Sequence, residues 1–152
     1  MTAIDPREFS GKRVLVTGGT KGAGNAIADR FLQGGATVAI TARSAPAENT
    51  AAQFIQADLS TSQGAAHVIH EILDRFKGVD IIIHNVGASS APSGGFVTVT
   101  DELWQQAVNE NLYPAVRLDR GLLPSMIERG SGVIVHISSI QRTLRSVCAG
   151  RR

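Results

Sequence analysis

The sequence of 152 residues predicts an α/β fold, a doubly wound domain with a mostly parallel sheet. Apolar, strand-like segments alternate with amphipathic, helix-like segments along the chain. A glycine-rich turn joins the first predicted strand to the first predicted helix, and residues 79–84 are apolar through Ile81, Ile82 and Ile83. Such a continuous run suits a strand that is buried on both faces of a parallel sheet. We therefore expect the five predicted strands to lie together in one such sheet.

Each predicted element has its own signal. Helix 24–33 ends at two glycines, and helix 60–76 has an apolar stripe with Ser60 as its expected N-cap. Helix 101–129 should be broken or bent near Pro114 and again near Pro124, because proline lacks the N–H that continues a helix. Residues 85–100 are rich in glycine and serine and are expected to form a loop. The predicted strands are 12–17, 36–41, 53–57, 79–84 and 133–137.

The composition restricts the function classes. The chain has 15 basic and 13 acidic residues, and four of the arginines fall within the last eleven residues. The positive charge therefore belongs to the end of the chain rather than to a face of the domain, which argues against a nucleic-acid-binding protein. Cys148 is the only cysteine, so an internal disulfide is excluded. We expect a cytoplasmic protein without a membrane segment.

The turn from Thr17 to Gly24 predicts a phosphate-binding element. Gly18 allows a sharp turn out of the strand, and Gly22 leaves room for a pyrophosphate beside the backbone. Gly24 allows the helix to pack close to the strand. The first N–H groups of the helix would then face the phosphates.

Several motifs occur in the same order as in the short-chain dehydrogenase/reductase family, and the chain resembles that family from about residue 12 to about residue 139. Thr17-Gly18 with Gly22 and Gly24 matches the family's glycine motif, and Asn85-Val86-Gly87 stands in place of its NNAG motif. The resemblance implies a Rossmann-type, NAD(P)-binding domain with the strand order 3-2-1-4-5, truncated after strand five. It also implies catalytic roles for Ser139, which would polarise a substrate carbonyl, and for Asn111, which would support a proton relay. The implied cofactor-binding residues are Thr17, Gly18, Thr20, Lys21, Gly22, Gly24, Arg43, Asp58, Leu59, Asn85 and Gly87.

The residue at the end of the second predicted strand indicates whether the chain prefers NAD or NADP. An NAD-preferring chain usually has an acidic residue there, which binds the ribose 2′-hydroxyl. This chain has Arg43 instead, and Lys21 lies in the glycine turn. Both cations could bind a 2′-phosphate, so NADP(H) is the expected cofactor. The alternative is that both are ordinary surface cations.

The family's catalytic tyrosine and lysine have no counterpart in this sequence. No Tyr-x-x-x-Lys occurs, the only tyrosine is Tyr113, and the lysines are Lys12, Lys21 and Lys77. We therefore expect a chain truncated before that motif, with one domain over residues 1–144 and an irregular, non-family tail over 145–152.

The expected function is carbonyl/alcohol hydride transfer by descent, with weak activity or none. The alternative is a non-catalytic dinucleotide-binding module or a partner of a full-length subunit.

Two further expectations concern surfaces and metals. The fifth strand would leave an uncovered apolar edge, which favours homo-oligomers or aggregation. His84 and His136 are expected on adjacent strands, and His67 and His70 on one helix, each pair in a structural role. None of the four histidines has metal-ligand spacing to a cysteine or an acid, so no metal site is expected.

Overall fold

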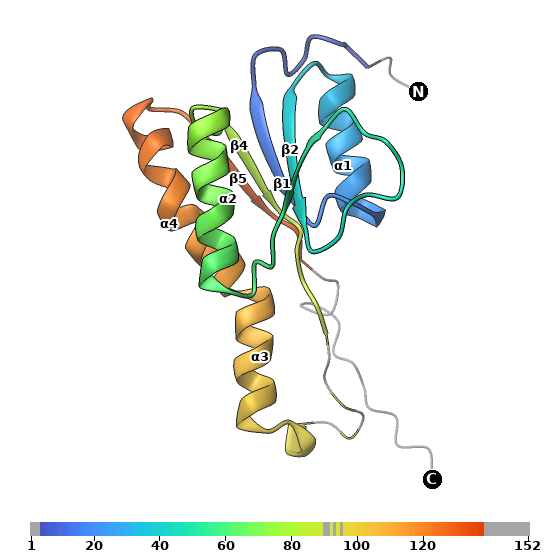
Figure 1. Cartoon of the computed structure of the whole chain (residues 1–152), viewed down its shortest axis with the longest axis vertical. Helices are drawn as coiled ribbons and strands as arrows, with labels where there is room; N and C mark the ends of the chain where they lie inside the picture. The colour runs from blue at the N-terminus through green and yellow to red at the C-terminus, as the bar shows by residue number, and fades with distance from the viewer. Residues whose placement is uncertain (1–3, 90–91, 93, 95, 139–152) are drawn as a thin grey trace.

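The computed structural model describes residues 4–89, 92, 94 and 96–138. It contains a parallel five-stranded sheet in the order β3-β2-β1-β4-β5, which confirms the predicted fold class and strand order (Figure 1). Every neighbouring pair of strands is parallel. The strands are β1 (Arg13–Thr17), β2 (Thr37–Ala42), β3 (Gln53–Gln56), β4 (Ile81–His84) and β5 (Val133–His136).

Helices cover both faces of this sheet. Helix α1 lies against one face, and α2 and α4 lie side by side over the other (Figure 1). The two faces follow from the alternation of side chains along β1: Leu15 packs in the core cluster with Leu118 and Leu122 of α4, whereas Val14 and Val16 pack in the cluster on the α1 side. The helical elements are α1 (Gly22–Gln33), α2 (Ser62–Arg75), η1 (Phe96–Thr98), α3 (Asp101–Asn111) and α4 (Tyr113–Glu128).

The ends of two helices differ from the prediction. Thr61, not Ser60, caps α2: its Oγ1 accepts a hydrogen bond from the N–H of Gly64 at 3.0 Å. The Ser60 hydroxyl instead donates to Asp58. The break near Pro114 is present, because α3 ends at Asn111 and α4 starts at Tyr113. Proline is tolerated in that first turn, where its missing N–H would have no partner in the helix.

No break occurs at Pro124, where the sequence predicted a second break or bend. Helix α4 continues through this residue as far as Glu128. The side chains of Leu122 and Met126, on either side of it in sequence, are buried in the core. Burial of this apolar face stabilises the helix, and we infer that it offsets the loss of one backbone hydrogen bond at the proline.

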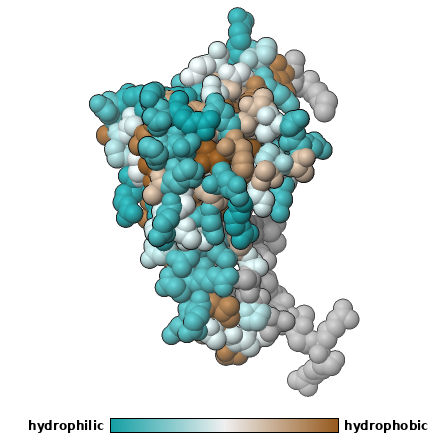
Figure 2. Space-filling view, viewed as in Figure 1, coloured by the Kyte–Doolittle hydropathy of each residue, from teal (hydrophilic) through white to brown (hydrophobic). Residues whose placement is uncertain are grey.

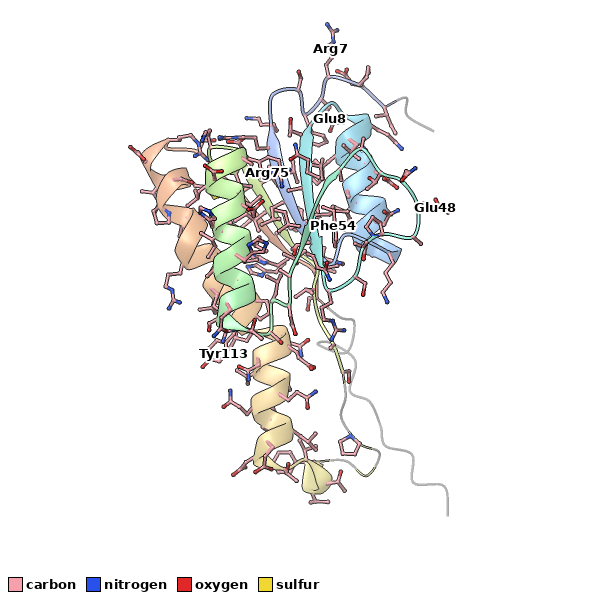
Figure 3. The ribbon with its side chains drawn as sticks, viewed as in Figure 1. Arg7, Glu8, Glu48, Phe54, Arg75 and Tyr113 are labelled. Atoms are coloured by element: carbon pink, nitrogen blue, oxygen red, sulfur yellow. The ribbon has the colours of Figure 1, made fainter. Side chains whose placement is uncertain are left out.

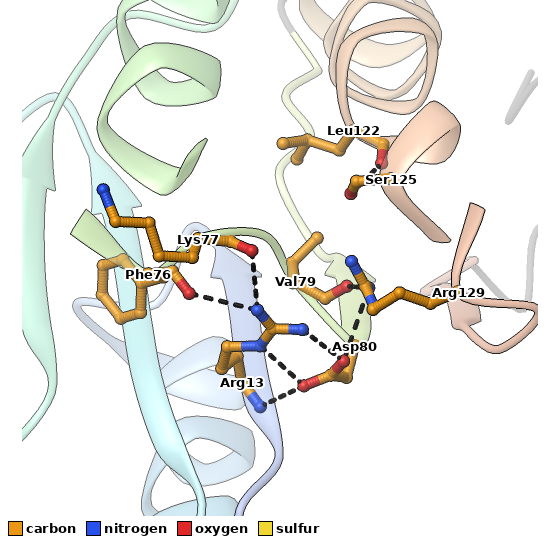
Figure 4. Close-up of polar contacts among 8 residues, drawn as sticks. All are labelled: Arg13, Phe76, Lys77, Val79, Asp80, Leu122, Ser125 and Arg129. Carbon is orange, nitrogen blue, oxygen red and sulfur yellow. Dashed lines mark hydrogen bonds and ion pairs between the residues drawn. The ribbon is translucent and has the colours of Figure 1, made fainter. Parts of the chain in front are cut away.

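An ion-pair network joins β1, β4 and α4 at the amino ends of the strands (Figure 4). The Arg13 guanidinium donates to both carboxylate oxygens of Asp80, at 2.9 and 2.7 Å, and Arg129 lies 3.4 Å from the same carboxylate. Arg13 also donates to the carbonyl oxygens of Phe76 and Lys77. The hydrogen bond from Arg13 lowers the pKa of Asp80 to about 2, so the carboxylate is charged at neutral pH.

Helix α3 extends away from the body of the molecule (Figure 1). It contains no buried residue, and exposed aromatic and aliphatic side chains gather near its first turn (Figure 2). Phe96, Val97 and Trp104 are the largest of them. Among the residues described above, no helix has both the length and the apolar character needed to cross a bilayer.

Candidate functional site

A groove of about 710 Å³ lies at the carboxyl ends of β1, β2 and β4 and next to β3. Ligands of doubly wound sheets bind at this edge. The groove brings together most of the residues that the sequence assigned to a cofactor, although these come from four separate turns of the chain. Those that line it are Gly18, Thr20, Lys21, Gly22, Arg43, Asp58, Leu59, Asn85 and Gly87.

The glycine turn has the geometry that the sequence analysis expected. Gly18 and Gly22 have φ values of +66° and +56°, in the left-handed region that favours glycine. A Cβ on Gly22 would meet nothing within 4 Å, so the space beside this residue is open. A Cβ on Gly24 would lie 2.2 Å from the carbonyl oxygen of Gly18, so only glycine allows α1 to start so close to β1.

Thr17 and Gly24 support the groove rather than line it. The Thr17 side chain is fully buried, and its Oγ1 accepts hydrogen bonds from the N–H groups of Asn85 and Val86 at 2.9 and 3.0 Å. The Asn85 side chain donates in return to the carbonyl oxygens of Thr17 and Gly18, at 3.1 and 3.3 Å. These hydrogen bonds hold the ends of β1 and β4 together and fix the start of the glycine turn.

The N-terminus of α1 faces this groove without a side-chain cap in the described part of the chain. Lys21 occupies the N-cap position in an extended conformation, and its side chain accepts no hydrogen bond from the helix. The first turn of α1 also contains no acidic residue. The free N–H groups and the positive end of the helix dipole are therefore available to an anion.

Charged side chains line the groove. Lys21 and Arg43 are exposed, whereas Leu59 is buried. Asp58 accepts hydrogen bonds from the Ser60 hydroxyl and the Ser60 N–H, at 2.7 and 3.0 Å. The Ser60 hydroxyl lowers the pKa of Asp58 most, and the Arg43 charge adds a smaller effect in the same direction. Asp58 is therefore a carboxylate at neutral pH.

Of the two predicted catalytic residues, the structure describes Asn111, while Ser139 lies outside the described residues. Asn111 is the last residue of α3. Its side-chain amide donates to the carbonyl oxygens of Ala88 and Ala107, at 3.0 and 2.9 Å, and its Oδ1 accepts from the N–H of Ala88 at 3.0 Å. Asn111 thus fixes the segment directly after Gly87, which lines the groove.

The sequence analysis missed Asp119 as a partner of the strand histidines. Its carboxylate lies 2.7 Å from Nε2 of His84, and His136 stacks on His84 with ring centroids 4.8 Å apart and an angle of 16° between planes. Burial lowers the pKa of His84, and the carboxylate opposes this shift. The ligand atoms of His84, Asp119 and His136 all lie within 4.8 Å of one another, a grouping of possible metal ligands that the sequence did not predict.

Comparison with known proteins places this geometry in a family. The sequence model of the short-chain dehydrogenase family matches residues 12–149 of this chain. An uncharacterized oxidoreductase, YvrD of Bacillus subtilis, is 35% identical over 137 residues, which cover 84% of this chain and 51% of YvrD. The chain spans about half the length of the curated relatives it matches.

Solved structures give the same result. A short-chain dehydrogenase from Streptomyces avermitilis superposes with a TM-score of 0.79 at 34% identity, over 89% of this chain and 52% of that one. L-sorbose reductase from Gluconobacter frateurii, complexed with NADPH and L-sorbose, gives a TM-score of 0.80 at 30% identity, over 91% of this chain and 56% of that one. On its fold, its glycine turn and its family match, this chain belongs to the short-chain dehydrogenase family.

Proposed function

We propose that the groove binds NADP(H) and that the chain is the dinucleotide-binding half of an oxidoreductase acting on a carbonyl/alcohol pair. The observation that supports this most directly is the uncapped N-terminus of α1 behind a glycine turn, in a groove that also contains Arg43 and Asp58. The bound cofactor would supply or accept the hydride. The single cysteine is compatible with the proposed cytoplasmic location.

Each side of the groove would hold a different part of the dinucleotide. The free N–H groups of α1 would bind the pyrophosphate, and Asp58 with Leu59 would contact the adenine. Arg43 and Lys21, which both line the groove, would bind the 2′-phosphate of NADP(H). No acidic residue stands at the end of β2 to bind the 2′-hydroxyl of NAD.

Calorimetric titration of the full chain with NADPH and with NADH tests this proposal. We expect NADPH to bind at least about tenfold more tightly, because a charge-assisted bond to phosphate contributes about 1.5–3 kcal/mol. Arg43→Gln should remove most of this preference and leave NADH binding unchanged. Lys12→Gln is the control, since Lys12 is an exposed cation that does not line the groove. Equal affinity for both cofactors in the unaltered chain would refute the NADP preference.

A second candidate function is cofactor binding without turnover, alone or as a partner of a full-length subunit. Tyr113, the only tyrosine, is not among the residues that line the groove. It lies at the start of α4 (Figure 3). The Arg117 guanidinium lies over its ring. Loss of a general acid/base costs about 10²–10⁴-fold in rate. Saturable NADPH binding with no oxidation across a panel of aldehydes and ketones would support this candidate, and turnover would exclude it.

A further inference from the structure

Helix α4 contacts the turn that follows β3 through Arg117. This half-buried side chain donates from Nη1 to the carbonyl oxygen of Ser60 at 2.9 Å, across 57 positions of sequence. Its guanidinium also lies over the ring of Tyr113, 4.9 Å from the centroid and one helical turn earlier. The ring packs against the guanidinium, which favours the orientation in which Nη1 reaches Ser60.

Ser60 in turn holds the carboxylate of Asp58. Its N–H and its hydroxyl both donate to Oδ1 of Asp58, and no hydrogen bond to Oδ2 is found within the described residues. Asp58 and Ser60 both line the groove, whereas Arg117 does not. These hydrogen bonds therefore form a continuous path from Arg117 through Ser60 to Asp58 in the groove.

We propose that Arg117 is a positioning residue for the adenine side of the groove, an inference that rests on the proposed function. By fixing the Ser60 carbonyl, Arg117 fixes the hydrogen-bond donors that hold Asp58. The carboxylate is then oriented before the ligand arrives, with Oδ2 left to accept a hydrogen bond from an amino group such as that of adenine. The N–H and hydroxyl of Thr61 also donate to the Asp58 carbonyl oxygen. The turn therefore keeps part of its order without Arg117, and we expect a modest loss of affinity.

The test measures NADPH affinity of the full chain by calorimetry. Arg117→Met keeps the apolar stem and removes the donor, and we expect it to weaken binding about threefold to tenfold, the value of one hydrogen bond. Arg117→Lys can still donate to the carbonyl of Ser60 and should recover at least half of the loss. Arg120→Met is the matched control, because Arg120 is an exposed arginine on the same helix that does not line the groove.

A double-mutant cycle with Asp58→Ala separates positioning from general destabilisation. If Arg117 acts through Asp58, then Arg117→Met weakens binding no further once Asp58 is alanine. Additive losses would overturn the inference, as would unchanged affinity in Arg117→Met. If Arg117→Met loses its cooperative thermal transition, Arg117→Gln replaces it in the same cycle. A folded, unaltered chain that does not bind NADPH would overturn the proposed function itself, whereas the other outcomes concern Arg117 alone.

Discussion

β1 and β5 are short apolar strands of the same sheet, yet they differ strongly in burial. Val14, Leu15 and Val16 of β1 are at most 1% exposed, whereas Val133 and Val135 of β5 are 52% and 38% exposed. β1 pairs with β2 and β4 and has helices on both faces. β5 pairs with β4 alone in the described part of the chain. Position in the sheet, and not the composition of the strand, decides how much apolar surface is buried.

The same contrast applies to function. The glycine turn follows β1, Arg43 follows β2 and Asn85 follows β4, and all three line one groove. The β5 side contributes the exposed residues Val133, Val135 and Ile137. Apolar edges of this kind are surfaces for further pairing. We therefore expect the β1 side to tolerate substitution poorly and the β5 side to tolerate it well.

The largest effect is expected at Gly24. Gly24→Ala places a Cβ against the Gly18 backbone, which should cost up to about 3 kcal/mol of folding stability and weaken NADPH binding. Gly121→Ala in α4 is the comparison, because its Cβ would meet the Ile69 side chain, with Cδ1 at 2.4 Å, and not the backbone. A side chain can shift more easily than backbone, so we expect a smaller cost than at Gly24. Urea denaturation of both variants measures the difference. A cost at Gly121 as large as that at Gly24 would contradict the contrast.

A matched pair of valines compares the two strands directly. Val16→Ala removes buried carbon atoms and should cost about 2 kcal/mol, whereas Val135→Ala should change stability by less than about 0.5 kcal/mol. Both values come from the same urea titrations. Similar costs would show that β5 is covered in solution.

Asp80 should stabilise the sheet in a pH-dependent way. Its pKa is lowered to about 2 in the folded chain, so its contribution is present above the unfolded value near 3.8 and is lost as the pH falls through 2. Asp80→Asn should therefore cost about 2 kcal/mol at neutral pH, and this difference should shrink from about pH 5 towards pH 2. Urea titrations of both proteins at several pH values measure it. A pH-independent difference would exclude the ion pair as the cause.

An effect on stability as small as that of Val135→Ala is expected from Val135→Lys. A lysine on an edge strand discourages pairing with another chain and should change folding stability by less than about 0.5 kcal/mol. Sedimentation velocity should show less self-association than in the unaltered chain. Equal self-association in both would mean that the β5 edge is not the surface involved.

The sheet and the groove could be predicted from local patterns. Alternating apolar segments indicated a parallel sheet with helices on both faces, and Gly18, Gly22 and Gly24 marked the glycine turn. Each of these signals lies within a few neighbouring residues. The resemblance to a known family then assigned Asp58 and Asn85 to the same site.

Contacts between distant side chains could not be predicted. Asp119 meets His84 across 35 positions, and Arg117 meets Ser60 across 57. Such pairs depend on the orientation in which each helix packs on the sheet, and a short sequence pattern does not determine that orientation. The predicted N-cap of α2 was wrong by one residue for a local reason, because the Ser60 hydroxyl bonds to Asp58, two residues earlier, instead of capping the helix.

The most direct test of the account follows backbone amide signals of the isotopically labelled chain by NMR while NADPH is added. The account predicts saturable shifts that are largest for residues 18–24 and for Asp58 to Ser60, with Val133–His136 unaffected. Saturable shifts confined to β5 or α3, or none at all in a folded chain, would contradict the claim that the groove at the end of β1 is the dinucleotide site.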